Sequence, residues 1–199
     1  MKRIRKRQGF LENFQNKNRT ISIGIIGAVS GCGVTTMSVA IANYLAGITR
    51  KKVAIYEYNS KRTFMRMNEY LGEDEIISEN GCTYFPKGNI SLASLYNEDF
   101  PIVVVDFGTE KTSINEFARC SYKVVMNSLE PWNMKTYIDF RNMLDEVSGS
   151  DTWLWIVNGD EKSVKGQRKN TRMHIVKRPC IDNPFIINAS LFEFFEALF

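Results

Sequence analysis

Residues 20–58 read TISIGIIGAVSGCGVTTMSVAIANYLAGITRKKVAIYEY, and this stretch decides the fold. Residues 20–27 are apolar and β-branched, which is typical of a strand. A glycine-rich turn follows, and the apolar residues of 35–48 then recur with helical spacing, so one helix face would pack on a sheet. Residues 52–58 predict a second strand. The order strand, loop, helix, strand indicates a parallel βαβ unit.

The rest of the chain continues this alternation. The run IVVVD at residues 102–106 is β-branched almost throughout, which predicts a strand buried on both faces. Weaker strand patterns fall at residues 82–85, 123–126, 152–157 and 173–176. Helical patterns cover residues 62–71, 113–120, 133–147 and 191–198. We therefore expect a three-layer α/β/α domain whose mostly parallel sheet has about six or seven strands.

The length and composition fit one domain with an arm. A chain of 199 residues with 44% hydrophobic and 24% charged residues can bury a full core. The formal net charge of +4 is uneven, because residues 2–19 carry +6 and the rest of the chain carries −2. We predict a basic arm at residues 1–19 and a folded domain at 20–199. The segment Lys2–Arg7 could bind nucleic acid or an anionic surface, or remain a solvated tail.

Cysteine spacing and hydropathy narrow the class of protein. The four cysteines lie 50, 38 and 60 residues apart, so neither a zinc site nor a disulfide framework is expected. We expect reduced thiols in a cytoplasmic protein. No apolar run reaches the roughly 20 residues that span a bilayer. The C-terminal sequence LFEFFEALF carries glutamates on its polar face, so we expect it to dock on the domain or at a dimer interface rather than on lipid.

The loop GAVSGCGVTT at residues 27–36 is the strongest local feature. It lies between a strand and a helix, where backbone N–H groups and the helix N-terminus can hold a phosphate. Its glycines let the backbone curl closely around an anion. Of Thr35 and Thr36, one could bind Mg²⁺ and the other could cap the helix or contact a phosphate. A plain turn with no ligand is the alternative.

Residues 29–36, VSGCGVTT, resemble the deviant Walker A motif K-G-G-x-G-K-[ST]-[ST] of the ParA/MinD branch of P-loop NTPases, the SIMIBI class. The helix sequence SVAIANYLA that follows is similar as well. The resemblance implies a P-loop NTPase-like fold, ATP or ADP with Mg²⁺ as ligands, and a homodimer across the loop face. It assigns nucleotide contacts to Gly31, Cys32, Gly33, Val34, Thr35, Thr36, Asp106 and Asn158, with the metal at Thr35 and Asp106.

Two departures from this motif change the expected chemistry. Val29 and Val34 stand where the family has lysines, which removes two positive charges from a site for a polyanion. Because phosphoryl transfer depends on positive charge around the transferring group, we expect slow or absent hydrolysis and assign no catalytic residue. The two valines would suit an apolar contact in a dimer formed without nucleotide. A subset of the family that resembles the CpaE/TadZ proteins, which localise pilus machinery, also includes altered loops.

Other positions of the family pattern are partly retained. Where the family ends its second strand with D-x-D, this chain has Glu57 and Asn59, and asparagine cannot take up a proton as aspartate does. Asp106 matches the Walker B position and keeps its carboxylate. Asn158 matches an adenine contact, or else forms an ordinary turn. Cys32 lies near a helix N-terminus that would stabilise a thiolate, so a reactive thiol is an alternative role.

The leading hypothesis is a ParA/MinD-like pseudo-ATPase that acts as a localisation, assembly or nucleotide-sensing factor, with protein partners in a secretion- or pilus-type machinery. A second hypothesis is a non-specific DNA-binding partition-type protein that uses Lys2–Arg7 and Lys162–Arg178. The latter stretch could instead be a charged exposed loop. A third hypothesis is a true ATPase that takes its lysine from elsewhere, such as Lys61 or Lys111.

Overall fold

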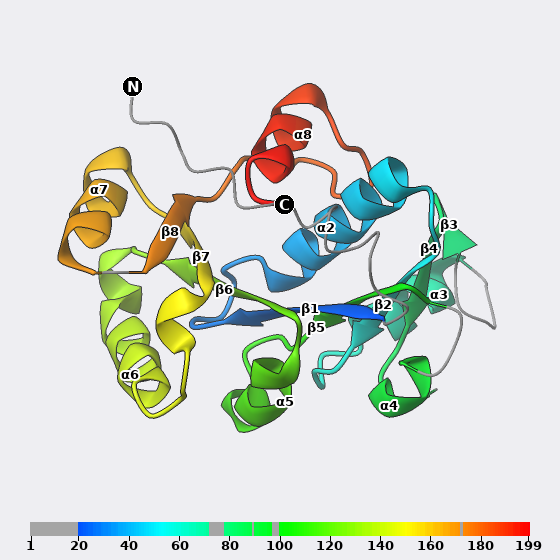
Figure 1. The fold of residues 1–199 in the computed structure, drawn as a ribbon, viewed down its shortest axis with the longest axis horizontal. Helices are drawn as coiled ribbons and strands as arrows, with labels where there is room; N and C mark the ends of the chain where they lie inside the picture. The colour runs from blue at the N-terminus through cyan, green and yellow to red at the C-terminus, as the bar shows by residue number, and fades with distance from the viewer. Residues whose placement is uncertain (1–19, 72–77, 89, 97–99, 172) are drawn as a thin grey trace.

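The computed structural model describes residues 20–71, 78–88, 90–96, 100–171 and 173–199, so the predicted arm lies outside the described residues. Within these ranges, one sheet of eight strands forms the centre of the domain (Figure 1). The strands are β1 (Ile21–Gly27), β2 (Val53–Glu57), β3 (Ser78–Glu79), β4 (Cys82–Phe85), β5 (Ile102–Asp106), β6 (Tyr122–Ser128), β7 (Leu154–Asn158) and β8 (His174–Lys177). Their spatial order is β3-β4-β2-β5-β1-β6-β7-β8, and each neighbouring pair is parallel except β3 and β4.

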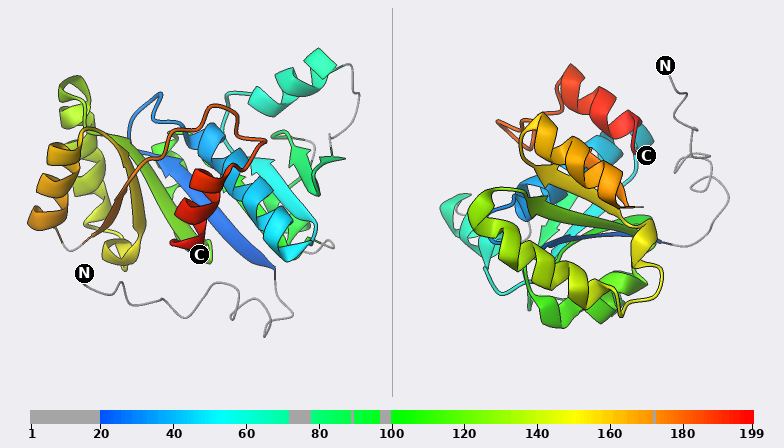
Figure 2. Two further views of the ribbon diagram at one scale, coloured as in Figure 1. Left: turned by 90° about the horizontal axis from the view of Figure 1, so that it is seen from above. Right: turned by 90° about the vertical axis from the view of Figure 1, so that its left-hand side faces the viewer.

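Helices cover both faces of this sheet, which confirms the expected three-layer α/β/α architecture (Figures 1 and 2). The helices are α2 (Val34–Thr49), α3 (Thr63–Leu71), α4 (Leu92–Leu95), α5 (Ile114–Arg119), α6 (Met134–Leu144), α7 (Glu161–Asn170) and α8 (Ala189–Glu196). Short 3-10 turns occupy Lys111–Ser113, Pro131–Asn133 and Ser150–Thr152. α2 and α8 lie on one face of the sheet, whereas α5 and α6 lie on the other.

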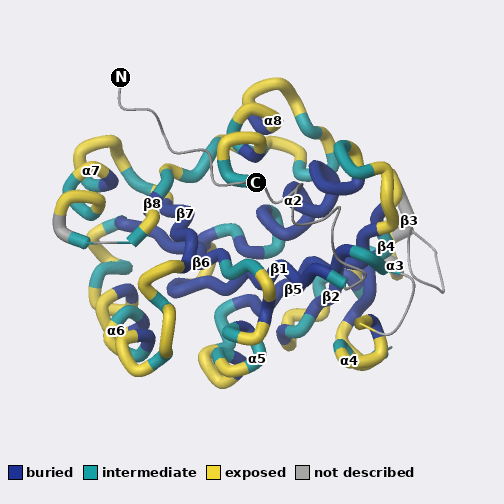
Figure 3. Tube along the Cα trace, in the orientation of Figure 1, coloured by how far each residue is buried: buried dark blue, intermediate teal, exposed yellow. Residues whose placement is uncertain are grey.

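The middle of the sheet is apolar because helices cover it on both sides. β1, β2 and β5 contain only buried residues, and Figure 3 shows them as buried along their length. Gly24 of β1 allows close packing, since a Cβ there would lie 2.8 Å from Phe117 Cδ2 and 2.9 Å from Cys120 Sγ. The register of β2 and β5 sets Glu57 beside Asp106. Two carboxylates therefore end neighbouring strands at the centre of the domain.

Two parts of the fold differ from the prediction. The interpretation of Lys162–Arg178 as an exposed loop is wrong, because α7 and β8 occupy most of it. α7 begins after Asp160, whose carboxylate accepts hydrogen bonds from the Ser163 N–H at 2.8 Å and the Ser163 hydroxyl at 2.9 Å. This helix is polar, so its cap indicates it better than hydrophobic periodicity does. The short antiparallel strand β3 is also absent from the prediction.

The C-terminal helix α8 docks on α2, as expected from its apolar sequence. Asn188 caps α8 by accepting a hydrogen bond from the Leu191 N–H at 2.9 Å. The Tyr44 ring of α2 lies 5.6 Å from the Phe192 ring and 5.2 Å from the Phe195 ring. Such edge and tilted aromatic contacts stabilise the packing of two helices. In the described parts of the chain, no helix combines the length and apolarity needed to cross a membrane.

Candidate functional site

The candidate site lies where the parallel strands end. Parallel strands finish on the same side of a sheet, so the loops that follow them come together there, and open α/β sheets bind ligands at this edge. The loop at residues 28–33 leaves β1 at the centre of this edge. The strand ends around it are Gly27, Glu57, Asp106, Asn158 and Lys177.

The loop at residues 28–33 has a backbone suited to an anion. Gly31 and Gly33 have φ angles of 76° and 93°, which glycine adopts with little strain. Gly33 occupies the N-cap position of α2, and no side chain caps the first N–H groups of this helix. Free N–H groups at a helix N-terminus attract an anion, and the helix dipole adds to this attraction.

Thr35 and Thr36 lie inside the first turn of α2 and are partly buried. The expectation that one of them caps the helix is wrong, because α2 begins one residue earlier, at Val34, and Gly33 takes the cap position. Both threonines remain at the helix end that faces the candidate ligand. Their contacts with Mg²⁺ and phosphate stay predictions.

The two valines that replace the family's lysines point into the core. Val29 is 2% exposed and Val34 is 6% exposed. Gly27 packs against this layer, since a Cβ there would lie 2.8 Å from both Val34 Cγ2 and Cys32 Sγ. The predicted apolar dimer contact through Val29 and Val34 is wrong, because the domain's own packing already covers both side chains.

Cys32 is an inert thiol. Its side chain is 3% exposed, and burial raises the pKa of the thiol to about 11. The N–H groups of Val29 and Cys32 and the charges of Arg178 and Lys61 lower this pKa, but burial outweighs them. A thiol with this pKa stays protonated at neutral pH and is a poor nucleophile. The alternative of a reactive Cys32 is therefore wrong.

We predict that the native protein has one fast-reacting thiol among the described residues, at Cys180. All four cysteines are free, and three of them are buried whereas Cys180 is exposed. Titration with an aromatic disulfide reagent should modify Cys180 rapidly and the buried thiols only after unfolding. Cys180→Ser should abolish the fast phase, whereas Cys32→Ser should leave it unchanged. A fast phase that follows Cys32 would contradict the burial of the loop thiol.

Asp106 is a fully buried carboxylate, and among the described residues one of its oxygens lies outside ordinary hydrogen-bond distance of a donor, although the Thr35 side chain is near enough to favour its ionised form. Its Oδ1 accepts hydrogen bonds from the Gly108 N–H at 2.8 Å and from the Asn59 amide at 3.0 Å. Its Oδ2 has no hydrogen-bond partner within the described ranges. Burial raises the pKa of this carboxyl, and the Glu57 charge adds to the rise, although Thr35 and the Gly108 N–H act against it. A buried oxygen without a donor is unfavourable unless a cation or ligand reaches it.

Glu57 and Asn59 have structural partners. Glu57 accepts hydrogen bonds from the Thr63 N–H at 2.6 Å and the Phe64 N–H at 3.2 Å, so it holds the start of α3. Both oxygens of this carboxylate are therefore engaged at the start of α3. The Asn59 amide donates to Asp106, which orients that carboxylate without adding a further negative charge to those of Asp106 and Glu57.

Thr35 and Asp106 fit a magnesium ion that arrives with a nucleotide. Thr35 favours the charged form of Asp106, and the unpartnered Oδ2 supplies an oxygen ligand. Mg²⁺ is usually held by one or two protein oxygens together with phosphates and water. The residues that the structure describes contain no group of three or more His, Cys, Asp or Glu that could hold a metal alone. A preformed metal centre is thus not indicated there.

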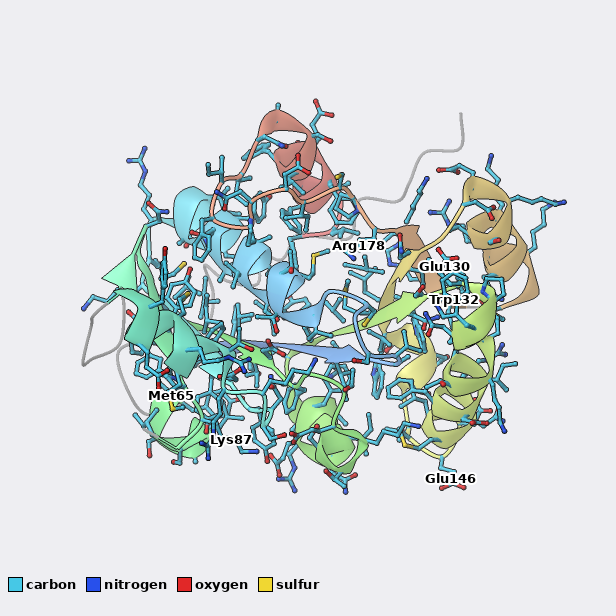
Figure 4. All side chains as sticks on the ribbon, turned by 180° about the vertical axis from the view of Figure 1, so that it is seen from behind. Met65, Lys87, Glu130, Trp132, Glu146 and Arg178 are labelled. Carbon is cyan, nitrogen blue, oxygen red and sulfur yellow. The ribbon has the colours of Figure 1, made fainter. Side chains whose placement is uncertain are left out.

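Two positively charged side chains from outside the loop at residues 28–33 influence its electrostatics. Arg178, which follows β8, donates from Nη1 to the Cys32 carbonyl at 3.3 Å (Figure 4). Lys61, in the turn after β2, favours the ionised forms of Cys32 and Asp106, and its N–H donates to Asn59 Oδ1 at 2.9 Å. In the sequence, Arg178 is only one member of a basic cluster. The signal that singles it out is its place directly after a parallel strand.

Two further members of the basic cluster at Lys162–Arg178 have protein partners. Arg168 donates to the Ile175 carbonyl at 2.8 Å, and Lys177 pairs with Glu161 at 3.2 Å. Arg172 lies outside the described residues. The exposed lysines of α7 are Lys162, Lys165 and Lys169.

Asn158, the predicted adenine contact, is exposed at the end of β7. Its carbonyl accepts a hydrogen bond from the Leu129 N–H at 2.8 Å. The Asn158 side chain is therefore at the edge of the sheet where the parallel strands end. β7, which carries it, pairs with β8, the strand that precedes Arg178. The contact with adenine stays a prediction.

Several solved ATP-binding proteins have a similar fold. A plasmid partition protein of Borrelia burgdorferi B31 bound to AMPPNP is 14% identical over 90% of this chain and 97% of its own, with a TM-score of 0.65. Cobyrinic acid a,c-diamide synthase of Mycobacterium smegmatis, with an ATP analogue and magnesium, is 12% identical over 90% and 92%, with a TM-score of 0.62. A ParA family ATPase of Chlorobium tepidum TLS is 12% identical over 83% and 86%, with a TM-score of 0.60. No protein-family model and no curated protein sequence matches the chain.

These likenesses define the class of fold. The chain has a ParA/MinD-like α/β fold of the P-loop NTPase type, as the resemblance implies. MinD of Aquifex aeolicus also aligns, with 15% identity over 75% of this chain and 73% of its own and a TM-score of 0.52. At these identities the comparison establishes architecture alone. The bound AMPPNP, ATP analogue and magnesium belong to the neighbours.

Proposed function

We propose that this chain is a ParA/MinD-like pseudo-ATPase that binds ATP or ADP with Mg²⁺ weakly and hydrolyses ATP slowly or not at all. It acts as a localisation, assembly or nucleotide-sensing factor. The proposal rests on one contrast. Among the described residues, no side chain caps the N-terminus of α2, where the loop at residues 28–33 ends, whereas Val34 beside it is buried in the core.

Nucleotide binding is supported by groups that still suit phosphate and magnesium. The uncapped N-terminus of α2 attracts an anion. Thr35 and the unpartnered Oδ2 of Asp106 provide oxygens for Mg²⁺. Solved structures with this fold hold AMPPNP, or an ATP analogue with magnesium, which supports the same ligand class here.

Slow hydrolysis follows from the residues around the loop. Neither Val29 nor Val34 can neutralise phosphate charge, and both are buried. Glu57 is engaged at the start of α3, and Asn59 donates to Asp106, so neither is free to activate water. Without a lysine of the loop on the transferring group, its transition state lacks a main source of stabilisation.

A weak nucleotide site can still serve a sensing function. A ligand shifts a protein between states only by its differential affinity for them, so hydrolysis is not required for sensing. We propose that nucleotide-dependent surfaces recruit protein partners of a localisation or assembly machinery, with a homodimer as one form. Such a dimer would use surfaces other than the buried Val29 and Val34.

Calorimetry with Mg·ATP and Mg·ADP tests this proposal directly. We expect dissociation constants on the order of 0.1–1 mM, as for a weak site. ATP turnover should be no faster than about 10⁻³ s⁻¹, comparable with unassisted GTPases. Sizing with and without nucleotide reports the dimer. The absence of binding at millimolar nucleotide would overturn the nucleotide role, and turnover near 1 s⁻¹ would overturn the pseudo-ATPase.

A true ATPase that uses Lys61 is the second candidate. The charge of Lys61 reaches Asp106 and Cys32, whereas no such influence on the site is found for Lys111 in the described residues. Nucleic-acid binding is less well supported. It would depend on the α7 lysines and on Lys2–Arg7, which lies outside the described residues, because Arg168 and Lys177 already have protein partners.

A further inference from the structure

Arg178 is held in a fixed place beside the loop. Its N–H donates to the Val157 carbonyl at 2.8 Å, which extends the pairing of β7 and β8 by one residue. The sheet therefore sets the position of the Arg178 Cα at the edge where β1 also ends. A side chain attached at such a point is positioned more closely than one on a free loop.

The guanidinium of Arg178 contacts the loop at residues 28–33. Nη1 donates to the Cys32 carbonyl at 3.3 Å. A Cβ on Gly33 would lie 2.9 Å from both Cζ and Nη1 of Arg178, so the absence of a side chain at Gly33 makes room for this approach. The positive charge therefore sits at the N-terminus of α2, although Arg178 is 146 residues away from Cys32 in the chain.

The Arg178 guanidinium has N–H donors that are available to a ligand. In the described ranges it forms no ion pair with a carboxylate, and the long hydrogen bond to Cys32 uses one of its five N–H groups. Its neighbours in the same stretch are engaged, because Lys177 pairs with Glu161 and Arg168 bonds to the Ile175 carbonyl. An unpaired, partly buried guanidinium at a helix N-terminus favours an anion with several oxygens.

We propose that Arg178 binds the phosphates of a nucleoside diphosphate or triphosphate, and so supplies from the end of β8 the charge that Val34 does not. The inference rests on the proposed nucleotide binding. A second observation points to the same ligand: the unpartnered Oδ2 of the fully buried Asp106 calls for a cation that would accompany the phosphates. Arg178 then acts as a binding residue and also sets the specificity for phosphate.

The geometry also explains binding without efficient turnover. Arg178 is anchored on the sheet edge beside Gly33, whereas the Val34 side chain starts within α2 and is buried in the core. A cation that interacts equally with the ground state and the transition state increases affinity without increasing the rate. Arg178 therefore suits a sensor better than a catalyst.

Calorimetry on Arg178→Gln tests the inference, with Lys177→Gln as the matched control that removes an adjacent positive charge. The probes are Mg·ADP and inorganic pyrophosphate with Mg²⁺, so that contacts with the base and with phosphate are separated. We expect Arg178→Gln to weaken both probes about tenfold, or about 1.4 kcal/mol. Lys177→Gln should change both less than twofold, and Arg178→Lys should recover part of the loss. Thermal melting checks that each variant is folded.

The outcomes separate this inference from the proposed function. If the wild-type protein binds both probes and Arg178→Gln binds them equally well, the proposed nucleotide binding is supported and the proposed role of Arg178 is wrong. If Arg178→Gln binds more tightly, Arg178 obstructs the loop and the inference is overturned. If the wild-type protein binds neither probe at millimolar concentration, both proposals fail together.

Discussion

Val34→Lys is expected to tighten Mg·ATP binding by about 30- to 100-fold, which corresponds to about 2–3 kcal/mol. The new ammonium group would lie at the start of α2, beside the uncapped N–H groups that face the proposed phosphates. At about 4 Å, a charge pair near a protein surface gains about 4 kcal/mol, and desolvation of the lysine offsets part of this gain.

The same change should destabilise the free protein. Val34 is 6% exposed and lies against Gly27 and Cys32, so lysine loses apolar packing and must bring its charge to the surface. We expect the free energy of unfolding to fall by about 1–2 kcal/mol without nucleotide, within the usual range for core substitutions. Saturating Mg·ATP should restore it, because a ligand that binds only the folded state stabilises that state.

Val34→Met is the matched control, since it has a similar length and no charge. It should bind Mg·ATP no better than the wild-type protein in the same calorimetric titration. Equal gains in Val34→Met and Val34→Lys would show that shape, and not charge, limits the site. No gain in Val34→Lys, with wild-type binding intact and the variant folded, would show that the loop does not place phosphates near this position.

Asp106→Asn is expected to raise the free energy of unfolding by about 1 kcal/mol at neutral pH, as often happens when a charge kept for function is removed. Asp106 is fully buried, and burial raises the pKa of its carboxyl. The amide oxygen can still accept hydrogen bonds from Gly108 and Asn59, while the uncompensated charge disappears. Denaturant unfolding at neutral pH without Mg²⁺ measures this change.

The gain from Asp106→Asn should depend on pH in a defined direction. Because the pKa of Asp106 is higher in the folded protein, the acid form is favoured by folding. The protonated group costs no charge burial below its ordinary pKa of 3.8, and that advantage is lost as the pH rises through the folded pKa. The stability difference between variant and wild type should therefore be small below pH 3.8 and grow with pH until the pH has passed the folded pKa of Asp106.

Asp106→Asn should also remove the effect of Mg²⁺ on nucleotide binding. The wild-type protein should bind ATP more tightly with Mg²⁺ than without it, whereas the variant should show less than a twofold difference by calorimetry.

Glu57→Gln is the matched control for Asp106→Asn. Glu57 is equally buried but accepts two hydrogen bonds at the start of α3, so its loss should lower stability. A less stable Asp106→Asn at neutral pH would show that the carboxylate is well compensated in the free protein.

The sequence by itself determines the order of the main apolar strands and helices and the position of the glycine loop. Both are local properties: β-branched runs such as residues 102–106 favour buried strands, and apolar residues at helical spacing favour α2. The absence of lysine at Val29 and Val34 is also visible there. Polar elements such as α7 carry no such periodicity, so the same signals do not predict them.

Only the tertiary structure decides what the site residues face. It buries Val34 and Cys32, commits Glu57 to the start of α3 and, among the described residues, leaves Asp106 Oδ2 without a hydrogen-bond partner. It also places Arg178 on the carbonyl of Cys32, across 146 positions of the chain. These contacts depend on which strands become neighbours and on which face each side chain is buried. Long-range packing sets both, and the sequence pattern around each residue does not contain that information.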